Sequence, residues 1–142
     1  MTPRERVLAE CRHRGRDLVT AGCVDLLEGR SGTVDDALVA ALGGEAAEYV
    51  LAGEEGGKTG YWPRVWAARG LIHTWDDSAT AAIIYATRDS SWRVREMAAR
   101  VVARHHVQEA HQAMTELRGD EIPRVHAAAG KALANMNEQP QP

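Results

Sequence analysis

Apolar residues recur at helical spacing most clearly between residues 92 and 120. One stripe occupies positions 94, 97, 98, 101 and 102, which is the spacing of a single face of an amphipathic helix. A second helical stripe occupies positions 107, 110, 113, 114 and 117, and Gly119 and Asp120 then mark its end. The pattern predicts a unit of two antiparallel helices joined by short turns.

This unit belongs to a repeat. The sequence Arg-Val-x-Ala-Ala-x-Gly occurs at residues 64–70 and again at 124–130, and a related sequence occupies residues 93–100. Aligning the three copies on Val65, Val94 and Val125 gives two steps of roughly thirty residues, the first slightly shorter than the second. A period of this size is typical of arrays in which helix pairs stack on one another. We therefore expect these valines to be buried at equivalent positions between repeats.

The rest of the pattern extends the array toward the N-terminus. We expect about nine helices, over residues 3–14, 16–27, 34–42, 45–52, 62–75, 79–87, two in the unit 92–120, and 123–136. Thr33 is the expected N-cap of the third helix. The predicted fold is an all-α, right-handed α-solenoid. It forms a single domain over residues 1–136, with its clearest repeats at 62–136 and a disordered polar tail at 137–142.

Residues 53–60 are richer in glycine than the other turns, and their Gly-Gly-Lys-Thr stretch fits a permissive phosphate-loop pattern. A working phosphate loop follows a strand and leads directly into a helix. Here a helix precedes the segment, residues 60–63 separate it from the next helix, and Glu54 and Glu55 would repel a phosphate. The segment is therefore predicted to be a mobile, solvent-exposed loop.

Composition limits the classes of function. The chain has 142 residues with 17 basic and 20 acidic side chains, which gives a formal net charge of -3. This weak acidity argues against nonspecific binding to nucleic acid or to a membrane surface, although it leaves room for a local basic stripe. No apolar run approaches the ~20 residues that span a bilayer, and the charged N-terminus is unlike a secretory signal. We expect a cytoplasmic protein.

The groups that carry catalysis or bind metals do not form a recognisable set. Cys11 and Cys23 are twelve residues apart, a spacing that fits no zinc motif. His106 and His111 are five apart, which suits two ligands on one helix face poorly. The serines occupy cap or turn positions, so no Ser-His-Asp arrangement is expected. We predict no catalytic, cofactor-binding or metal-binding residues.

The unit at residues 93–117 resembles a HEAT-like repeat of the phycobilisome-lyase type. Repeats of that type carry Val-Arg-x-x-Ala-Ala-x-Ala-Leu in one helix, then a short turn and a second, leucine-rich helix. The resemblance covers residues 62–133 and is weaker over 34–52. It implies a helical solenoid that acts as a scaffold, adaptor or regulatory subunit. Some members attach bilin chromophores, and other HEAT-like folds are DNA glycosylases, but the matched positions here are packing positions and carry over no catalytic residue.

Arginines directly precede the repeat valines, at Arg64, Arg93 and Arg124. Stacked repeats would place these side chains in a row that could hold carboxylates or phosphates of a partner bidentately. Acids in adjacent turns, such as Asp89 and Asp120, could instead pair with the row across repeats. Both interpretations stay open, and the structural ladder is the preferred one.

A surface of mixed aromatic and basic side chains is the most specific candidate for a partner-binding site. In the valine alignment Trp66, Arg95 and His126 share one position, which is polar in two copies and is therefore expected to be exposed. Arg69 lies three residues after Trp66 and should sit beside it. A large ring combined with planar cations is typical of contacts with a peptide or an acidic segment. The alternative is that Trp66 packs against a neighbouring helix.

These observations favour a non-enzymatic protein-interaction module that binds an acidic or mixed segment of a partner protein or peptide. Two other classes stay open. One is a nucleic-acid-binding or base-modifying protein that uses the arginine row and the tryptophans. The other is a lyase-like protein that holds a small ligand or chromophore in a tryptophan-lined groove.

Overall fold

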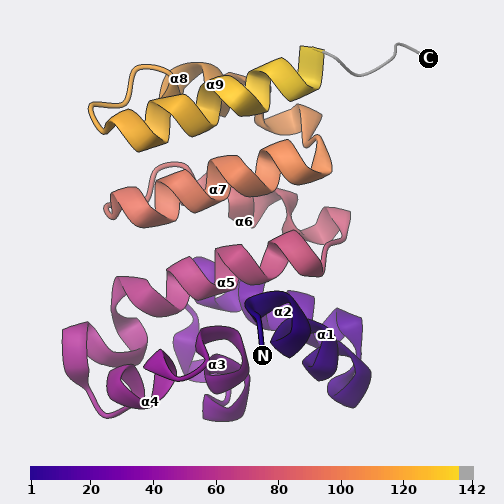
Figure 1. Ribbon diagram of the computed structural model, residues 1–142, viewed down its shortest axis with the longest axis vertical. Helices are drawn as coiled ribbons and strands as arrows, with labels where there is room; N and C mark the ends of the chain where they lie inside the picture. The colour runs from indigo at the N-terminus through magenta and orange to yellow at the C-terminus, as the bar shows by residue number, and fades with distance from the viewer. Residues whose placement is uncertain (138–142) are drawn as a thin grey trace.

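The computed structural model describes residues 1–137, and most of this part of the chain is helical (Figure 1). Its nine α-helices are α1 (Pro3–Arg14), α2 (Arg16–Leu27), α3 (Asp36–Gly43), α4 (Ala46–Leu51), α5 (Tyr61–His73), α6 (Thr80–Ala86), α7 (Trp92–His105), α8 (His111–Leu117) and α9 (Pro123–Asn137). Short 3₁₀ helices lie at Ser31–Thr33, Glu54–Thr59, Asp77–Ala79 and Gln108–Ala110. Within these residues there is no strand.

The helices stack in two layers. Figure 1 shows α5, α7 and α9 one above another, with α6 and α8 behind them. We call α5, α7 and α9 the front layer. Contacts run from α5 to α7 and from α7 to α9, and α6 and α8 each pack on the helix of the front layer that follows them in sequence. At the N-terminal end the pattern changes, because α5 contacts α1, α2 and α3 together. The predicted all-α solenoid is confirmed.

Three helices of the front layer begin at residues 61, 92 and 123, so the step from one repeat to the next is the same both times. The valine alignment is therefore wrong at its first step: Pro63, not Val65, is the equivalent of Val94 and Val125. All three valines are nevertheless buried, as predicted. The equivalent residues Ala67, Ala98 and Ala129 are completely buried, and their small side chains let neighbouring helices approach closely.

Side chains at the N-termini of α1 and α3 cap these two helices. Thr2 and Glu5 form a reciprocal capping box at the start of α1. At α3 the N-cap is Asp35, whose carboxylate accepts a hydrogen bond of 2.8 Å from the N–H of Leu38. The prediction that Thr33 caps this helix is wrong, because Thr33 lies in a 3₁₀ turn and its hydroxyl bonds to the carbonyl of Arg30.

The glycine-rich segment was predicted to be a mobile loop, but it folds into 3₁₀ turns. Gly57 is buried, and Gly56 and Gly57 adopt positive φ angles that let the chain double back. Lys58 forms an ion pair of 3.0 Å with Asp36 of α3, which ties the segment to a neighbouring helix. Most of its other residues are exposed, as expected.

The disordered tail is predicted from residue 137, but Asn137 is the last residue of α9. The remaining tail residues, 138–142, lie outside the part of the chain that the structure describes.

His106 ends α7 in the left-handed conformation, with φ 53° and ψ 52°, and its Nδ1 is buried without a hydrogen-bond partner among the described residues. A non-glycine residue in this conformation costs roughly 1–2 kcal/mol, and glycine avoids most of that cost. We expect His106→Gly to raise the free energy of unfolding by about 1 kcal/mol and the melting temperature by about 3 °C. His106→Ala is the matched control, because it removes the imidazole but keeps the backbone strain. An equal gain in both variants would show that backbone strain is not the cause.

Candidate functional site

Arg64 and Arg95 occupy equivalent positions, and each forms a two-pronged ion pair with an aspartate 25 residues further along the chain. Arg64 donates from Nε and Nη2 to the carboxylate of Asp89 at 2.8 and 3.1 Å. Arg95 donates in the same way to Asp120 at 2.8 and 3.3 Å. Each pair joins a helix of the front layer to the turn that precedes the next such helix.

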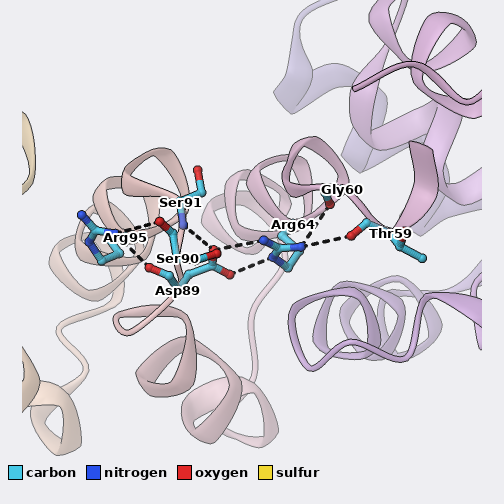
Figure 2. Close-up of polar contacts among 7 residues, drawn as sticks. All are labelled: Thr59, Gly60, Arg64, Asp89, Ser90, Ser91 and Arg95. Carbon is cyan, nitrogen blue, oxygen red and sulfur yellow. Dashed lines mark hydrogen bonds and ion pairs between the residues drawn. The ribbon is translucent and has the colours of Figure 1, made fainter. Parts of the chain in front are cut away.

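The same two arginines also bind backbone carbonyls of the turn that precedes their own helix. Figure 2 shows Nη1 of Arg64 donating to the carbonyls of Thr59 and Gly60, and Nη1 of Arg95 donating to those of Asp89 and Ser90. Each guanidinium therefore links two successive turns. Both arginines are part of the framework between repeats. For Arg64 this agrees with the structural interpretation of the arginine row, whereas Arg95 was expected on the partner-binding surface.

Asp120 is nearly buried in its pair. Burial opposes its ionisation, but the hydrogen bonds from Arg95 and from the backbone N–H of Ile122 outweigh burial, and together they hold the pKa of Asp120 below its usual value. The carboxylate is thus charged in the folded protein down to lower pH than in an unfolded chain.

The predicted arginine row is not a single row. With the constant step of the front-layer helices, Arg64 aligns with Arg95 and His126, whereas Arg93 and Arg124 align with Trp62. His126 is exposed, and the described chain has no further repeat to pair with it. The two rows differ in chemistry. The two arginines of the first row are bound to aspartates, whereas those of the second row, Arg93 and Arg124, lie beside aromatic rings.

Trp66 is buried and only 4% exposed, so the prediction that it is exposed is wrong. The corrected step aligns it with Met97, another buried residue, and not with Arg95. Its ring packs so closely on Gly43 of α3 that a Cβ atom at Gly43 would lie 2.5 Å from it. Trp66 therefore joins α5 to α3, and it cannot form an exposed surface with Arg95 and His126.

Arg69 also binds α3, at the N-terminal end of the stack. Its Nη2 donates a 2.7 Å hydrogen bond to the carbonyl of Leu42, and Nε of Arg6 donates to that of Ala41 at 3.0 Å. Both carbonyls belong to the last turn of α3, where unpaired acceptors and the helix dipole favour positive charge. Arg69 is thus a helix cap supplied by another helix, a role that its spacing from Trp66 did not indicate.

A second set of cations points away from the stack. Arg100 on α7 and Lys131 on α9 occupy the repeat position of Arg69 on α5, and both are exposed. Arg104, one helical turn beyond Arg100, is also exposed. Within residues 1–137 no carboxylate pairs with Arg100, Arg104 or Lys131. These side chains form what we call the basic face, on the outer side of α7 and α9.

Several positive charges also surround His73, at the end of the neighbouring helix α5. Burial lowers the pKa of His73 below its usual value. Nearby positive charges lower it further, those of Arg4, Arg69, Arg104 and His105. Positive charge therefore gathers on this side of the stack, although the chain as a whole has a net charge of -3.

A shallow groove of about 320 Å³ runs between α7 and α9 on the basic face. Arg100, Arg124 and Lys131 line its sides with Glu96, and the methyl groups of three alanines, Ala103, Ala127 and Ala128, complete the lining. Glu96 is mostly buried and accepts a 2.8 Å hydrogen bond from Nε of Arg124. The groove therefore has more positive than negative charge and offers small apolar contacts between its cations.

Sequence reasoning missed Arg100, Arg104 and Lys131. The available signal was the equal spacing of Arg69, Arg100 and Lys131 along the chain, which the valine alignment concealed. Of the predicted site residues, Arg93 and Arg124 lie at this face, and Arg124 lines the groove.

No cluster of three or more His, Cys, Asp or Glu within residues 1–137 could hold a metal ion. The thiols of Cys11 and Cys23 are free, and burial together with the neighbouring Cys11 raises the pKa of Cys23 to about 12. None of the helices in the described part of the chain combines the length and the apolar content that crossing a bilayer requires.

Comparison with known proteins identifies the type of repeat. A family model described as HEAT repeats matches residues 61–141, more than half of the chain. No curated protein and no solved structure matches the chain.

The pair between Arg95 and Asp120 leads to a prediction with a defined dependence on pH. Asp120→Asn should lower the free energy of unfolding by about 3 kcal/mol at pH 7, because it leaves the half-buried Arg95 without a carboxylate. The folded-state pKa of Asp120 is lowered, so its stabilising contribution is complete above the unfolded-chain pKa of about 3.9 and is lost as the pH falls through the folded-state pKa. The gap between wild type and variant should therefore stay constant down to about pH 5 and shrink below about pH 4.

Denaturant titrations at several pH values measure this gap. Glu121→Gln is the matched control, because Glu121 is the exposed neighbour of Asp120 and its loss should change stability by less than about 0.5 kcal/mol. A gap for Asp120→Asn that keeps its full size at pH 3 would show that the ion pair is not its source.

Proposed function

Since the chain belongs to the HEAT-repeat family, we propose that it is a non-enzymatic interaction module that binds an acidic segment of a partner protein along the basic face. On the motif at residues 93–102 we also assign its repeats to the phycobilisome-lyase type. The module acts as an adaptor or regulatory subunit, and its partner is held by contacts alone, without chemical change.

The observation that carries this proposal is the contrast between two groups of cations. Arg64 and Arg95 are saturated by aspartates and carbonyls, whereas Arg100, Arg104 and Lys131 are exposed and have no carboxylate within the described residues. Exposed cations on adjacent helices attract an acidic ligand and orient it before contact. At the same repeat position on α5, Arg69 caps α3, whereas Arg100 and Lys131 have no such structural partner within the described residues.

The form of the groove favours a peptide segment over a compact small molecule. Pockets for small ligands enclose most of the ligand surface, whereas this groove is shallow and open along its length. A peptide that lies along it can place carboxylates against Arg100 and Lys131 and small side chains against the alanine methyl groups.

Charge-reversal variants test the proposed surface. A labelled peptide rich in Glu and Asp should bind the wild-type protein, and Arg100→Glu combined with Lys131→Glu should weaken binding by at least about tenfold, measured by fluorescence anisotropy. The matched control is Arg88→Glu combined with Arg118→Glu, which makes the same change of net charge at exposed positions in the turns after α6 and α8. The control should change affinity by less than about threefold.

Three results would contradict the proposal. Equal loss in both double variants would mean that only net charge matters. Binding of the Gln/Asn version of the peptide with the same affinity would mean that its carboxylates are not recognised. Much tighter binding of a single-stranded oligonucleotide of matched length would assign the face to phosphate backbones instead.

A further inference from the structure

Arg93 stands among three aromatic rings where successive repeats meet. Its Cζ atom lies 4.6 Å from the ring centroid of Trp92, 5.5 Å from that of Trp62 and 5.7 Å from that of Tyr61. Tyr61 and Trp62 begin α5, whereas Trp92 and Arg93 begin α7. Two tilted rings of one repeat, with centroids 5.0 Å apart, therefore lie beside a guanidinium of the next repeat.

Within residues 1–137 the guanidinium of Arg93 makes no hydrogen bond and no ion pair. This sets it apart from Arg64, Arg95 and Arg124, each of which is bound to a carboxylate. Arg93 is nevertheless half-buried. Arginine has five N–H donors, so this side chain has a positive charge and donors that no group in the described part of the chain accepts, and they are open to solvent.

The rings give this cation a defined orientation. Attraction to the ring faces orients the guanidinium without using its N–H donors. The N–H groups at its edge therefore stay available for a ligand. Such an edge matches a carboxylate through two parallel hydrogen bonds. Because the rings already restrict the rotamers of Arg93, a ligand would lose less binding energy to ordering this side chain than to ordering a free arginine.

Arg124 connects this site to the groove. Its guanidinium lies 5.4 Å from the centroid of the same Trp92 ring, and its Nε is paired with Glu96. Glu96 thus pairs with Arg124, whereas no carboxylate pairs with Arg93 within the described residues, and the nearby carboxylate of Glu55 is bound to Nε1 of Trp62. One further carboxylate would balance this end of the basic face, beside the groove that Arg124, Arg100 and Lys131 line.

We propose that Arg93 is the anchor of the partner-binding face and takes one Asp or Glu carboxylate of the acidic segment through a bidentate pair. The inference rests on the proposed function and adds the position at which one acidic residue of the segment is bound specifically. Residues on either side of that carboxylate then contact Trp92 at one end and Arg100 with Lys131 in the groove.

Arg93→Lys separates this specific role from general attraction, because lysine keeps the charge but cannot form the bidentate pair. We expect it to weaken binding of the Glu/Asp-rich peptide by about tenfold, with a melting temperature close to that of wild type. Arg104→Lys is the matched control on the same helix face and should change affinity by less than about twofold. Intrinsic tryptophan fluorescence gives a second readout, because an anion bound beside Trp62 and Trp92 changes their emission.

The outcomes distinguish the anchoring role of Arg93 from the binding of an acidic segment. If the peptide binds wild type and Arg93→Lys equally, the assignment of Arg93 as the anchor is wrong, while the proposed binding of an acidic segment is retained. If the peptide does not bind wild type at all, the proposed function fails and the anchor fails with it. A variant that loses stability but keeps affinity would make Arg93 a packing residue. Tighter binding of inorganic phosphate or of an oligonucleotide than of the peptide would overturn the choice of a carboxylate.

A measurement on the wild-type protein covers the case in which Arg93→Lys does not fold. The Nε–Hε signal of Arg93 in an NMR spectrum should shift when the acidic peptide is added and should stay in place with its Gln/Asn counterpart. An Arg93 signal that does not move while the peptide binds would refute the anchor.

Discussion

The bidentate pair between an arginine of one front-layer helix and the aspartate in the turn before the next is the contact on which the arrangement of the repeats depends. It occurs twice with the same atoms, between Arg64 and Asp89 and between Arg95 and Asp120. Because a guanidinium and a carboxylate match only in a narrow range of positions, the pair fixes how far each helix is shifted along its neighbour. The constant step between the starts of α5, α7 and α9 follows that shift.

Once that step is established, two groups of cations can be distinguished among those that lie where the helices meet or on the basic face. Arg6, Arg64, Arg69 and Arg95 bind carbonyls or aspartates inside the framework. Arg93, Arg100, Arg104 and Lys131 lie on the outer side without a carboxylate in the described chain. Arginine pairs that are half-buried and hydrogen-bonded contribute to stability, whereas exposed cations contribute little to it. The second group is therefore the one that the proposed partner would contact.

The distribution of charge explains how a protein with a net charge of -3 can have a basic face. Between residues 35 and 55 there are six acidic side chains and no basic one. These residues lie mainly on α3, α4 and the following 3₁₀ turns, at the end of the stack opposite to α9 (Figure 1). Such a separation of charge would give the proposed acidic segment a preferred direction of approach, toward α7 and α9 and away from α3 and α4.

The local pattern of residues by itself determined the helices and their stacking into an all-α array, because apolar periodicity, caps and glycines act over a few residues. It also identified the valines Val65, Val94 and Val125 as buried. The valines gave a wrong first step between repeats, since Val65 lies two residues away from the position of Val94 and Val125, although the equal spacing of Arg69, Arg100 and Lys131 indicates the correct one. Only tertiary packing decided that Trp66 is buried against Gly43, that Arg69 caps α3, and that Arg93 lies among three rings. Each of these contacts joins helices that are distant in sequence, and their geometry depends on how the helices are shifted along one another, which periodicity within one helix does not contain.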